Sequence, residues 1–421
     1  MENVGAVFLC FCINLNVLKK LYKSRNKAKR SKVLAMSVTS DIKYIGVNDY
    51  EIELFEGMYE VPNGMSYNSY VILDEKIAVL DTVDEDFTYQ WIFNLQKVLE
   101  GRKPDYLIVQ HMEPDHSANI IHFVNQYPDT VLVASKIAFK MMKNYFGTEF
   151  EEKRIVVDEG DCLVLGKHHL KFITAPMVHW PEVIMTYDET EKTLFSADAF
   201  GRFGALDEEN EWINEARRYY FGIVGKFGIQ VQNLLGKLKN VEIQRICPLH
   251  GPVLAENIPY YLKAYHTWSS YEPEEDGILI VYTSVYGNTK KAVALLKEKL
   301  KEQGKLKVRA IELGNNDKSF AVAAAFRYPI LILATTTYNG DVFPAMREFI
   351  NCLTERNFSN RTVAFIENGS WATMATKRMR EKLEKCKGLK FLDTSVKIAS
   401  VLREESIAQI DTMISELRKE E

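Results

Sequence analysis

Short apolar runs alternate with segments of helical periodicity along the first two thirds of the chain. Residues 69–73 and 76–80 are apolar runs joined by Asp74 and Glu75, which predicts a β-hairpin. Further strands are expected at 105–109, at 131–134 and between 155 and 173, and helices at 86–100, 117–126 and 136–144. Strands that alternate with helices, with antiparallel hairpins among them, predict a layered αββα sandwich.

The alternation continues in the last third of the chain. Strands are expected at residues 278–282, 308–313, 329–334 and 362–366, and helices at 290–303, 317–326 and 344–355. A closing helix is predicted at 253–272, before a short, acidic, turn-forming stretch at 272–277 that predicts a linker. We therefore expect one domain at residues 37–271 and a second, also α/β, at 278–421.

The first 36 residues differ from the rest in composition. Residues 5–18 are apolar, and residues 19–32 carry eight Lys or Arg and no acid. A secretory signal has its charges before the apolar stretch, and a spanning helix needs roughly 20 apolar residues, so neither is predicted. Three interpretations stay open: a true start at Met36, a membrane-surface anchor, or a disordered extension. We expect a cytoplasmic protein.

Length and composition narrow the possibilities. A chain of 421 residues should hold two domains, and its 47% apolar and 26% charged content is that of an ordinary globular protein. The net charge of -4 argues against a general nucleic-acid binder. The six Cys residues include no Cys-x-x-Cys pair, so neither a disulfide framework nor a thiolate-bound metal of the rubredoxin type is expected.

The most informative segment is residues 110–117, directly after the apolar run 105–109. It holds four metal-capable side chains within six residues: His111, Glu113, Asp115 and His116. Because Pro114 cannot occupy the interior of a helix or a central strand, we expect a loop at the carboxyl end of the strand. In an extended loop side chains alternate, so His111, Glu113 and Asp115 would share one side. A solvated polar loop is the simpler alternative.

Three further candidate ligands each follow an apolar run: His179, Asp198 and His250. Each alone would most simply be a turn residue. Together with the first four they come from four separate strand ends, which is how open α/β sheets build sites. Seven ligands are too many for one tetrahedral zinc and suit two metals that share a carboxylate. The remaining His residues (122, 168, 169 and 266) are expected to be structural or on the surface, and the aromatic residues Trp212, Tyr219, Tyr220 and Phe221 to pack in the core.

Residues 111–116 resemble the metal loop of the metallo-β-lactamase superfamily, usually His-x-His-x-Asp-His, with Glu113 in place of the second His. Carboxylate is a harder ligand than imidazole and offsets the charge of a more oxidised metal, which favours iron over zinc. The same replacement marks the flavodiiron proteins, which the chain resembles over residues 37–421. The ligands that the resemblance implies are His111, Glu113 and His179 for the first iron, Asp115, His116 and His250 for the second, and Asp198 between them.

Three segments of the second domain carry the flavin part of the resemblance. Residues 283–289 lie between a strand and a helix, so their N–H groups and the helix N-terminus make an anion site, without the Lys-Ser/Thr ending of a nucleotide P-loop. They resemble the flavodoxin phosphate loop for FMN, and residues 335–340 and 367–372 match the two flavin-ring loops. For any one of them an ordinary βα turn is the alternative. The implied FMN contacts are Thr283, Ser284, Val285, Tyr286, Gly287, Asn288, Thr289, Thr335, Thr336, Thr337, Tyr338, Asn339, Gly340, Asn368, Gly369, Ser370 and Trp371, with Trp371 packing on the ring.

The resemblance implies a metallo-β-lactamase-like αββα domain with two irons, followed by a flavodoxin-like doubly wound sheet with FMN. It implies an oxidoreductase that reduces dioxygen to water, nitric oxide to nitrous oxide, or both. Two ferrous irons and reduced FMN hold the four electrons that dioxygen requires. The implied partners are an external donor, commonly a separate rubredoxin or a reduced deazaflavin, and a second copy of the chain. A head-to-tail dimer, or a dimer of such dimers, would bring one subunit's flavin beside the other's irons.

Two other functions stay open. A zinc hydrolase of the lactamase superfamily with a flavodoxin-like appendage would hold zinc and show thioesterase or phosphodiesterase activity. Glu113 and the three flavin segments argue against it. A non-enzymatic electron carrier would bind no iron, and the seven candidate ligands argue against that function.

Overall fold

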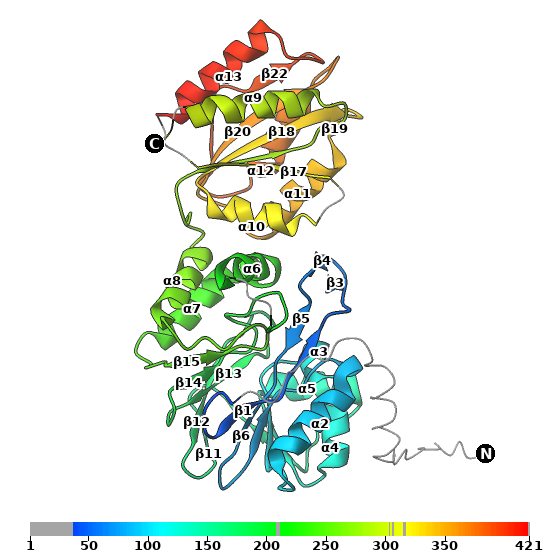
Figure 1. Ribbon diagram of the computed structural model, residues 1–421, viewed down its shortest axis with the longest axis vertical. Coiled ribbons are helices and arrows are strands. Elements are labelled where there is room, and N and C mark those ends of the chain that lie inside the picture. The colour runs from blue at the N-terminus through cyan, green and yellow to red at the C-terminus, as the bar shows by residue number, and fades with distance from the viewer. Residues whose placement is uncertain (1–36, 208–210, 303, 305–306, 315–316, 420–421) are drawn as a thin grey trace, which may run out of the picture.

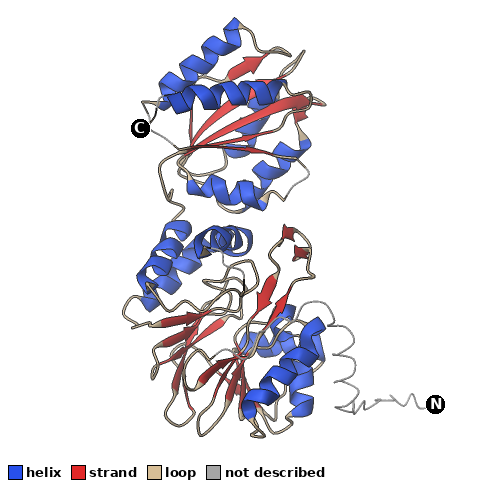
Figure 2. Ribbon diagram, in the orientation of Figure 1, coloured by secondary structure: helices blue, strands red, loops and turns tan. Residues whose placement is uncertain are grey.

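The computed structural model describes residues 37–207, 211–302, 304, 307–314 and 317–419. These residues form two lobes stacked along the long axis of the molecule (Figure 1), with helices flanking the sheets in both (Figure 2). The apolar stretch 5–18 and the basic stretch 19–32 lie outside the described residues, so the three interpretations of the first 36 residues stay predictions. None of the described helices is long and apolar enough to cross a membrane.

Two sheets packed face to face form the centre of the first lobe. The first sheet has the order β1 (Ile42–Tyr44), β6 (Tyr70–Ile72), β7 (Ala78–Leu80), β8 (Tyr106–Val109), β9 (Val131–Ala134) and β10 (Arg154–Val156). The second has the order β11 (Cys162–Val164), β12 (His169–Thr174), β13 (Ile184–Asp188), β14 (Thr193–Phe195) and β15 (Arg245–Cys247). Two short hairpins stand beside them: β2 (Val47–Asp49) with β5 (Met65–Tyr67), and β3 (Leu54–Phe55) with β4 (Tyr59–Glu60).

The sandwich follows from the alternation of apolar side chains along each strand. In β8 the side chain of Ile108 packs between the two sheets, whereas Leu107 and Val109 pack outward against helices. The helices on that side are α2 (Thr88–Leu99) after a turn η1 (Glu85–Phe87), α3 (Pro114–Ser117), α4 (Ile120–Gln126) and α5 (Lys136–Phe146). The second sheet is covered by α6 (Trp212–Tyr219), the π-helical turn η2 (Tyr220–Val224), η3 (Gly225–Phe227), α7 (Gly228–Leu238) and α8 (Ile258–Ser269). The predicted αββα sandwich is therefore confirmed.

The second lobe is a doubly wound sheet in which the long strands are parallel. Its order is β17 (Val308–Glu312), β16 (Ile278–Tyr282), β18 (Ile330–Tyr338), β20 (Thr362–Asn368) and then β21 (Lys390–Phe391) and β22 (Val396–Ile398), both paired with β20. Helices α9 (Asn288–Glu302) and α13 (Glu404–Leu417) cover one face, and α10 (Ser319–Arg327), α11 (Pro344–Glu355) and α12 (Ala375–Leu383) cover the other. In order of sequence the strands run 2-1-3-4-5, the order of flavodoxins.

The apolar core continues from the first lobe into the second. The ring of Phe221 stacks on that of Phe326 in α10, with centroids 3.9 Å apart. The buried guanidinium of Arg361 donates to the backbone oxygens of Tyr271 and Phe326. In the stretch expected to be a linker, Glu274 accepts hydrogen bonds from Trp268 and Arg217. The lobes are thus held by direct contacts as well as by the connecting chain, while the domain limits themselves stay predictions.

Two expected segments differ in the structure. Residues 110–117 are not entirely loop, because Pro114 occupies the first turn of the short helix α3, where its missing N–H costs nothing. The next helix begins at Ile120 rather than 117. Residues 335–338 belong to β18, which extends past its sheet and pairs with β19 (Asp341–Val342) in a hairpin. Asn339 and Gly340 turn that hairpin with positive φ, as a two-residue turn of this kind requires.

Candidate metal centre and flavin site

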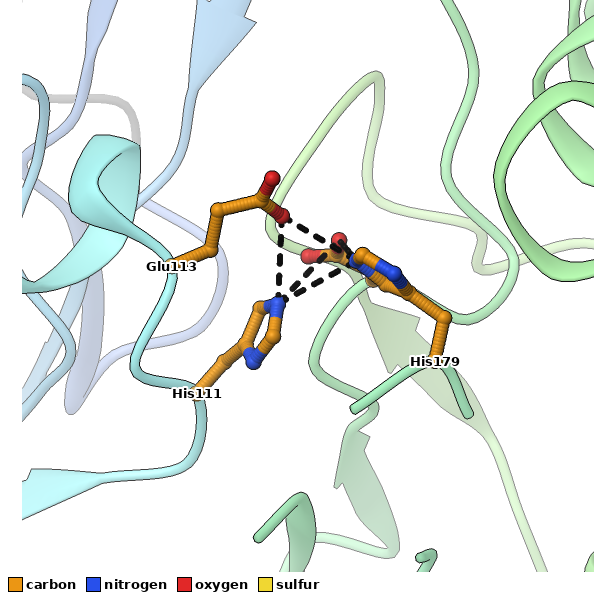
Figure 3. Close-up of side chains that lie close together, drawn as sticks. His111, Glu113 and His179 are labelled. Atoms are coloured by element: carbon orange, nitrogen blue, oxygen red, sulfur yellow. Dashed lines mark hydrogen bonds and ion pairs between the residues drawn. The ribbon is translucent and has the colours of Figure 1, made fainter. Parts of the chain in front are cut away.

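Four side chains from three distant segments converge beside the end of β8. His111 and Glu113 follow β8, His179 follows β12, and Asp198 follows β14. The Nε2 atoms of His111 and His179 are 3.3 Å apart, and Glu113 Oε2 lies 3.2 Å and 3.1 Å from them. Figure 3 shows these three side chains pointing toward one another. We define these four residues as the first cluster.

A second cluster consists of Asp115, His116 and His250. The Nε2 atoms of His116 and His250 are 3.0 Å apart, and Asp115 Oδ2 lies 3.3 Å from each. His250 comes from the loop after β15, whereas Asp115 and His116 lie in α3. The helical turn at Pro114 is the reason that Asp115 leaves the side shared by His111 and Glu113. The predicted alternation along residues 111–115 is therefore wrong at Asp115.

The carboxylate of Asp198 lies between the two clusters. Its Oδ2 is 3.1 Å from His179 Nε2, and its Oδ1 is 3.4 Å from His116 Nε2. Each oxygen thus faces a different cluster. This is the geometry that a carboxylate needs if it is to bind two ions at once.

The chemistry of these donors fits a pair of cations. The seven side chains are at most 13% exposed. Within the described part of the chain, both oxygens of Asp115 and Oδ1 of Asp198 are buried without a hydrogen bond. Buried carboxylates are costly unless they are well paired, and these have only ion-pair contacts of 3.3–3.9 Å with imidazoles. The imidazole nitrogens themselves lie 3.0–3.3 Å from one another and face the same small space. Two metal ions would satisfy these atoms together.

The electrostatics of the clusters favour positive charge. Burial by itself would lower the pKa of His179, but hydrogen bonds with Asp198 and Glu113 outweigh it and raise the pKa to about 9. Burial likewise opposes the charges of Asp198 and Glu113, yet the neighbouring imidazoles hold the pKa of both carboxyls below their usual range. The carboxylates are therefore ionised near neutral pH, and a metal would compete with protons for the imidazoles.

Neighbouring groups orient two of the imidazoles. His111 Nδ1 donates to Oε1 of the buried Glu182 at 2.8 Å, and the same oxygen accepts the backbone N–H of Met112 at 2.9 Å. His250 Nδ1 donates to the backbone oxygen of Ser66 at 2.7 Å. Each bond turns Nε2 toward the centre, as is usual for metal-binding His.

The backbone of the segment after β8 is fixed by a buried acid. Asp81 Oδ1 accepts the N–H of Gln110 at 2.7 Å, and Asp81 Oδ2 accepts from its side chain at 2.8 Å. Burial raises the pKa of Asp81 to about 6, although these hydrogen bonds oppose the shift. His111 therefore starts from a rigid position.

Sequence reasoning missed three residues around the clusters. Glu182 has no motif of its own, because Trp180, Pro181 and Glu182 would equally suit a surface turn. Tyr219 was expected only to pack in the core, yet its hydroxyl donates to Asp198 Oδ2 at 2.9 Å. The exposed residue Glu56, at the tip of the β3–β4 hairpin, turns its carboxyl to Glu113, and desolvation together with the charge of Glu113 raises its pKa to about 7. Only the fold brings these residues to the clusters.

The other four His residues agree with the prediction that they are structural or on the surface. His122, His169 and His266 are exposed. His168 is buried, with Nδ1 2.8 Å from Asp188. His168 lies close to the carboxylates of Asp41 and Glu191, and Lys167 forms an ion pair with Asp41. Asp41 and His168 thus already have ion-pair partners, in Lys167 and Asp188.

The three predicted flavin segments lie at the carboxyl ends of neighbouring strands β16, β18 and β20. Thr283 and Thr335, at the ends of the first two, share a hydrogen bond of 2.6 Å between their hydroxyls. The segment 283–289 continues into the first turn of α9, whose N–H groups have no partner within the helix. Gly287, with φ +84°, allows the sharp turn before that helix.

Aromatic side chains flank this edge of the sheet. Tyr286 is 92% exposed and Trp371 is 82% exposed. Large exposed rings in two of the three loops at the edge that carries the α9 N-terminus fit a planar ring system with a phosphate tail. Not all predicted contacts are surface residues: Thr283, Thr289, Thr335 and Asn368 are buried, and Thr337 Oγ1 accepts the N–H groups of Met374 and Ala375. These residues stabilise the conformation of the loops from their buried side.

Comparisons with known proteins agree with this architecture. Residues 65–251 match the model of the ODP family beta lactamases, and residues 279–404 match a flavodoxin domain. The chain is 28% identical over 363 residues to an anaerobic nitric oxide reductase flavorubredoxin of Escherichia coli, covering 83% of this chain and 75% of that protein. It is 29% identical over 370 residues to an uncharacterized protein of Methanocaldococcus jannaschii, covering 86% and 92%.

Solved structures share the whole fold. A rubredoxin oxygen:oxidoreductase from Desulfovibrio gigas superposes with a TM-score of 0.85 at 24% identity, covering 92% of this chain and 98% of that one. A flavodiiron protein from Giardia intestinalis gives 0.83 at 23% identity, covering 93% and 98%. The predicted fold, a metallo-β-lactamase-like sandwich followed by a flavodoxin-like sheet, is confirmed.

These findings define a two-domain metal- and flavin-dependent oxidoreductase. The order of the two domains, and the relatives that share this order, narrow the choice of family. The chain resembles the flavodiiron proteins in both domains and in their order, and its seven cluster residues and three flavin segments fit a pair of irons and FMN.

Proposed function

We propose that the chain reduces dioxygen to water, nitric oxide to nitrous oxide, or both, at two irons held by the two clusters. His111, Glu113 and His179 would bind the first iron, and Asp115, His116 and His250 the second. The observation that supports this assignment best is the position of Asp198, whose two oxygens face different clusters. When bound, the irons supply Lewis-acid and electron-transfer chemistry, and FMN supplies further electrons.

The residues around the clusters have separable tasks in this proposal. Each iron would be held by four side chains, with Asp198 counted twice, and could therefore take up a diatomic gas as a further ligand. Glu182 and the Ser66 carbonyl hold two imidazoles in orientation. The apolar rings of Phe55 and Phe203 lie around Tyr219 beside the second cluster and limit the entry of water.

The residues proposed to hold FMN are those of the three segments in the second lobe. The phosphate would lie at the N-terminus of α9, against Ser284, Asn288 and the backbone N–H of Thr289, with Trp371 on the ring. The metal clusters and these segments lie in different lobes of the chain (Figure 1). A head-to-tail homodimer, or a dimer of such dimers, would place one subunit's flavin beside the other's irons.

The relatives' names support both substrates and one class of donor. The Escherichia coli relative is named a nitric oxide reductase, and the Desulfovibrio gigas protein an oxygen oxidoreductase that uses rubredoxin. We propose a separate rubredoxin as the donor, with a reduced deazaflavin as the alternative. The cytoplasmic location, the absence of nucleic acid among its partners and the domain limits stay predictions.

The direct test is consumption of each gas by the purified protein. The full chain is reduced anaerobically, its iron and FMN are quantified, and oxygen and nitric oxide uptake are followed in parallel with an artificial donor and with rubredoxin. We expect uptake of at least one gas in proportion to iron content. Iron- and FMN-loaded protein that consumes neither gas with any donor would refute the proposal.

A further inference from the structure

The residues between Arg218 and Gly222 connect the metal clusters to the second lobe of the same chain. Tyr219 makes the first link, because its hydroxyl donates to Asp198 Oδ2 at 2.9 Å. Its ring is fully buried against the rings of Phe203, His250 and Phe55, with centroids 5.1, 5.5 and 6.4 Å away. The hydroxyl therefore has little freedom to leave Asp198.

The preceding residue, Arg218, makes the second link. Its Nη1 donates to Asp317 Oδ2 at 3.2 Å and to Ser319 Oγ at 3.0 Å, and both acceptors lie in the second lobe, at the start of α10. Its side chain is buried between the rings of Phe203 and Phe320, each 4.3 Å from the guanidinium carbon. Asp317 also accepts the backbone N–H of Glu60, from the β3–β4 hairpin, at 3.0 Å.

The following residues make the third link. Phe221 stacks on Phe326 of α10, and the Gly222 oxygen accepts hydrogen bonds from Tyr59 in the hairpin, at 2.9 Å, and from Arg356 at the end of α11. The backbone adopts a π-helical turn over Tyr220–Val224. Such turns are rare and are enriched at functional sites. Here the turn lets Tyr219 face Asp198 while Phe221 faces the second lobe.

We propose that Tyr219 is a positioning residue for the Asp198 carboxylate, and that the second lobe holds it in place through Arg218. This rests on the proposed role of Asp198 as the ligand shared by two irons. A bridging carboxylate must keep one oxygen toward each ion. A donor fixed on Oδ2 prevents rotation of the carboxylate toward a single cluster and withdraws electron density from the oxygen on the first-cluster side.

The chain offers a matched control at the next position. Tyr220 is also fully buried, but among the described residues its hydroxyl makes no hydrogen bond to Asp198 or to any other cluster residue. The full-length variants Tyr219→Phe and Tyr220→Phe each remove one buried hydroxyl, at adjacent positions. They are compared by iron content, by optical titration of the metal-free protein with Co²⁺, and by the reduction potentials of the iron-loaded protein.

For Tyr219→Phe we expect a loss of affinity for at least one Co²⁺ of about 10-fold, the lower end for partners of metal ligands. The iron reduction potential should shift, and Tyr220→Phe should match the wild type in both readouts. Equal behaviour of the two variants would overturn the proposal, whereas wild-type protein that takes up no second metal would refute the proposed function instead. Thermal unfolding of both variants separates loss of fold from loss of position.

The link to the second lobe has its own test. Arg218 pairs with Glu215 in its own lobe and with Asp317 in the second. Asp317→Asn removes the second-lobe charge, and we expect a two- to fivefold loss of Co²⁺ affinity in the same direction. Glu348→Gln is the control, because Glu348 pairs with Lys318 in the same region and its side chain is 63% exposed. If Asp317→Asn leaves both Co²⁺ affinities and the potential unchanged, the contribution of the second lobe is refuted.

Discussion

The metal clusters and the flavin segments differ in burial and in how far apart their residues lie in the sequence. Six of the seven cluster residues are buried and Glu113 is nearly so, and they come from four distant segments. Three of them also form a hydrogen bond with a neighbour outside the clusters: His111 with Glu182, His250 with Ser66, and Asp198 with Tyr219. The flavin segments are local loops on one sheet edge, and their two largest rings, Tyr286 and Trp371, are mostly exposed.

The difference shows which contacts stabilise each site. The clusters depend on the packing of the whole first lobe, and each ligand has a fixed place within it. The flavin loops instead leave large apolar rings in water, which a bound ring system would cover. Losing one cluster ligand should therefore abolish metal binding, whereas losing one flavin contact should weaken binding by degrees.

The largest effect is expected for Asp198→Ala. Without a carboxylate that faces both clusters, the protein should retain fewer than one iron per chain, lose gas reduction, and still bind FMN. Iron and flavin are measured on the same purified sample. The control Asp188→Ala also removes a buried carboxylate from the same sheet and should retain both irons. Gas reduction that survives in Asp198→Ala would show that Asp198 does not bridge.

The same contrast explains what the sequence could predict. Alternating apolar positions and strand ends identified both lobes and the seven cluster residues, because strand and helix periodicities are local and a His or acid after a strand is visible in one dimension. Glu182 and Tyr219 could not be found, since their roles depend on which strand ends become neighbours.

Errors at the level of single residues have equally local causes. The expectation for Asp115 failed because one helical turn at Pro114 replaces the extended backbone. The boundary at residue 335 failed because β18 stays paired with β20 through Thr336 and then pairs with β19 beyond the sheet. Neither the turn nor the pairing is encoded in periodicity alone.

A graded effect is expected for Trp371→Ala in the flavin segment. The loss of one aromatic stacking contact should weaken FMN binding by about 1 kcal/mol, or roughly fivefold in Kd. Iron content should not change. Flavin fluorescence titration of the FMN-free protein measures the effect, with Tyr89→Ala, an exposed aromatic on α2, as the control. An unchanged Kd would remove Trp371 from the flavin site.

A smaller effect is expected in the ion-pair network around His168, away from both sites. Burial opposes the charge of this imidazole, but the hydrogen bonds with Asp188 and Asp41 outweigh it and raise its pKa. Because the folded pKa lies above the unfolded value of about 6.5, the charged form stabilises the fold fully below that pH. This contribution is lost as the pH rises through the folded pKa.

The test compares urea unfolding of the wild type and His168→Gln at pH 6 and pH 9. The wild type should be the more stable at pH 6, and the difference should shrink at pH 9. His122→Gln, at an exposed position, should match the wild type at both. A difference that grows with pH would mean that His168 is held neutral instead.

The central claim is that the two clusters hold a pair of irons joined by Asp198. Metal and flavin analysis of the purified full chain, combined with Mössbauer spectroscopy of iron-57-enriched protein, tests it most directly. We expect two irons and one FMN per chain, with the irons magnetically coupled through the shared ligand. A single zinc ion per chain, or two irons without coupling, would contradict the account.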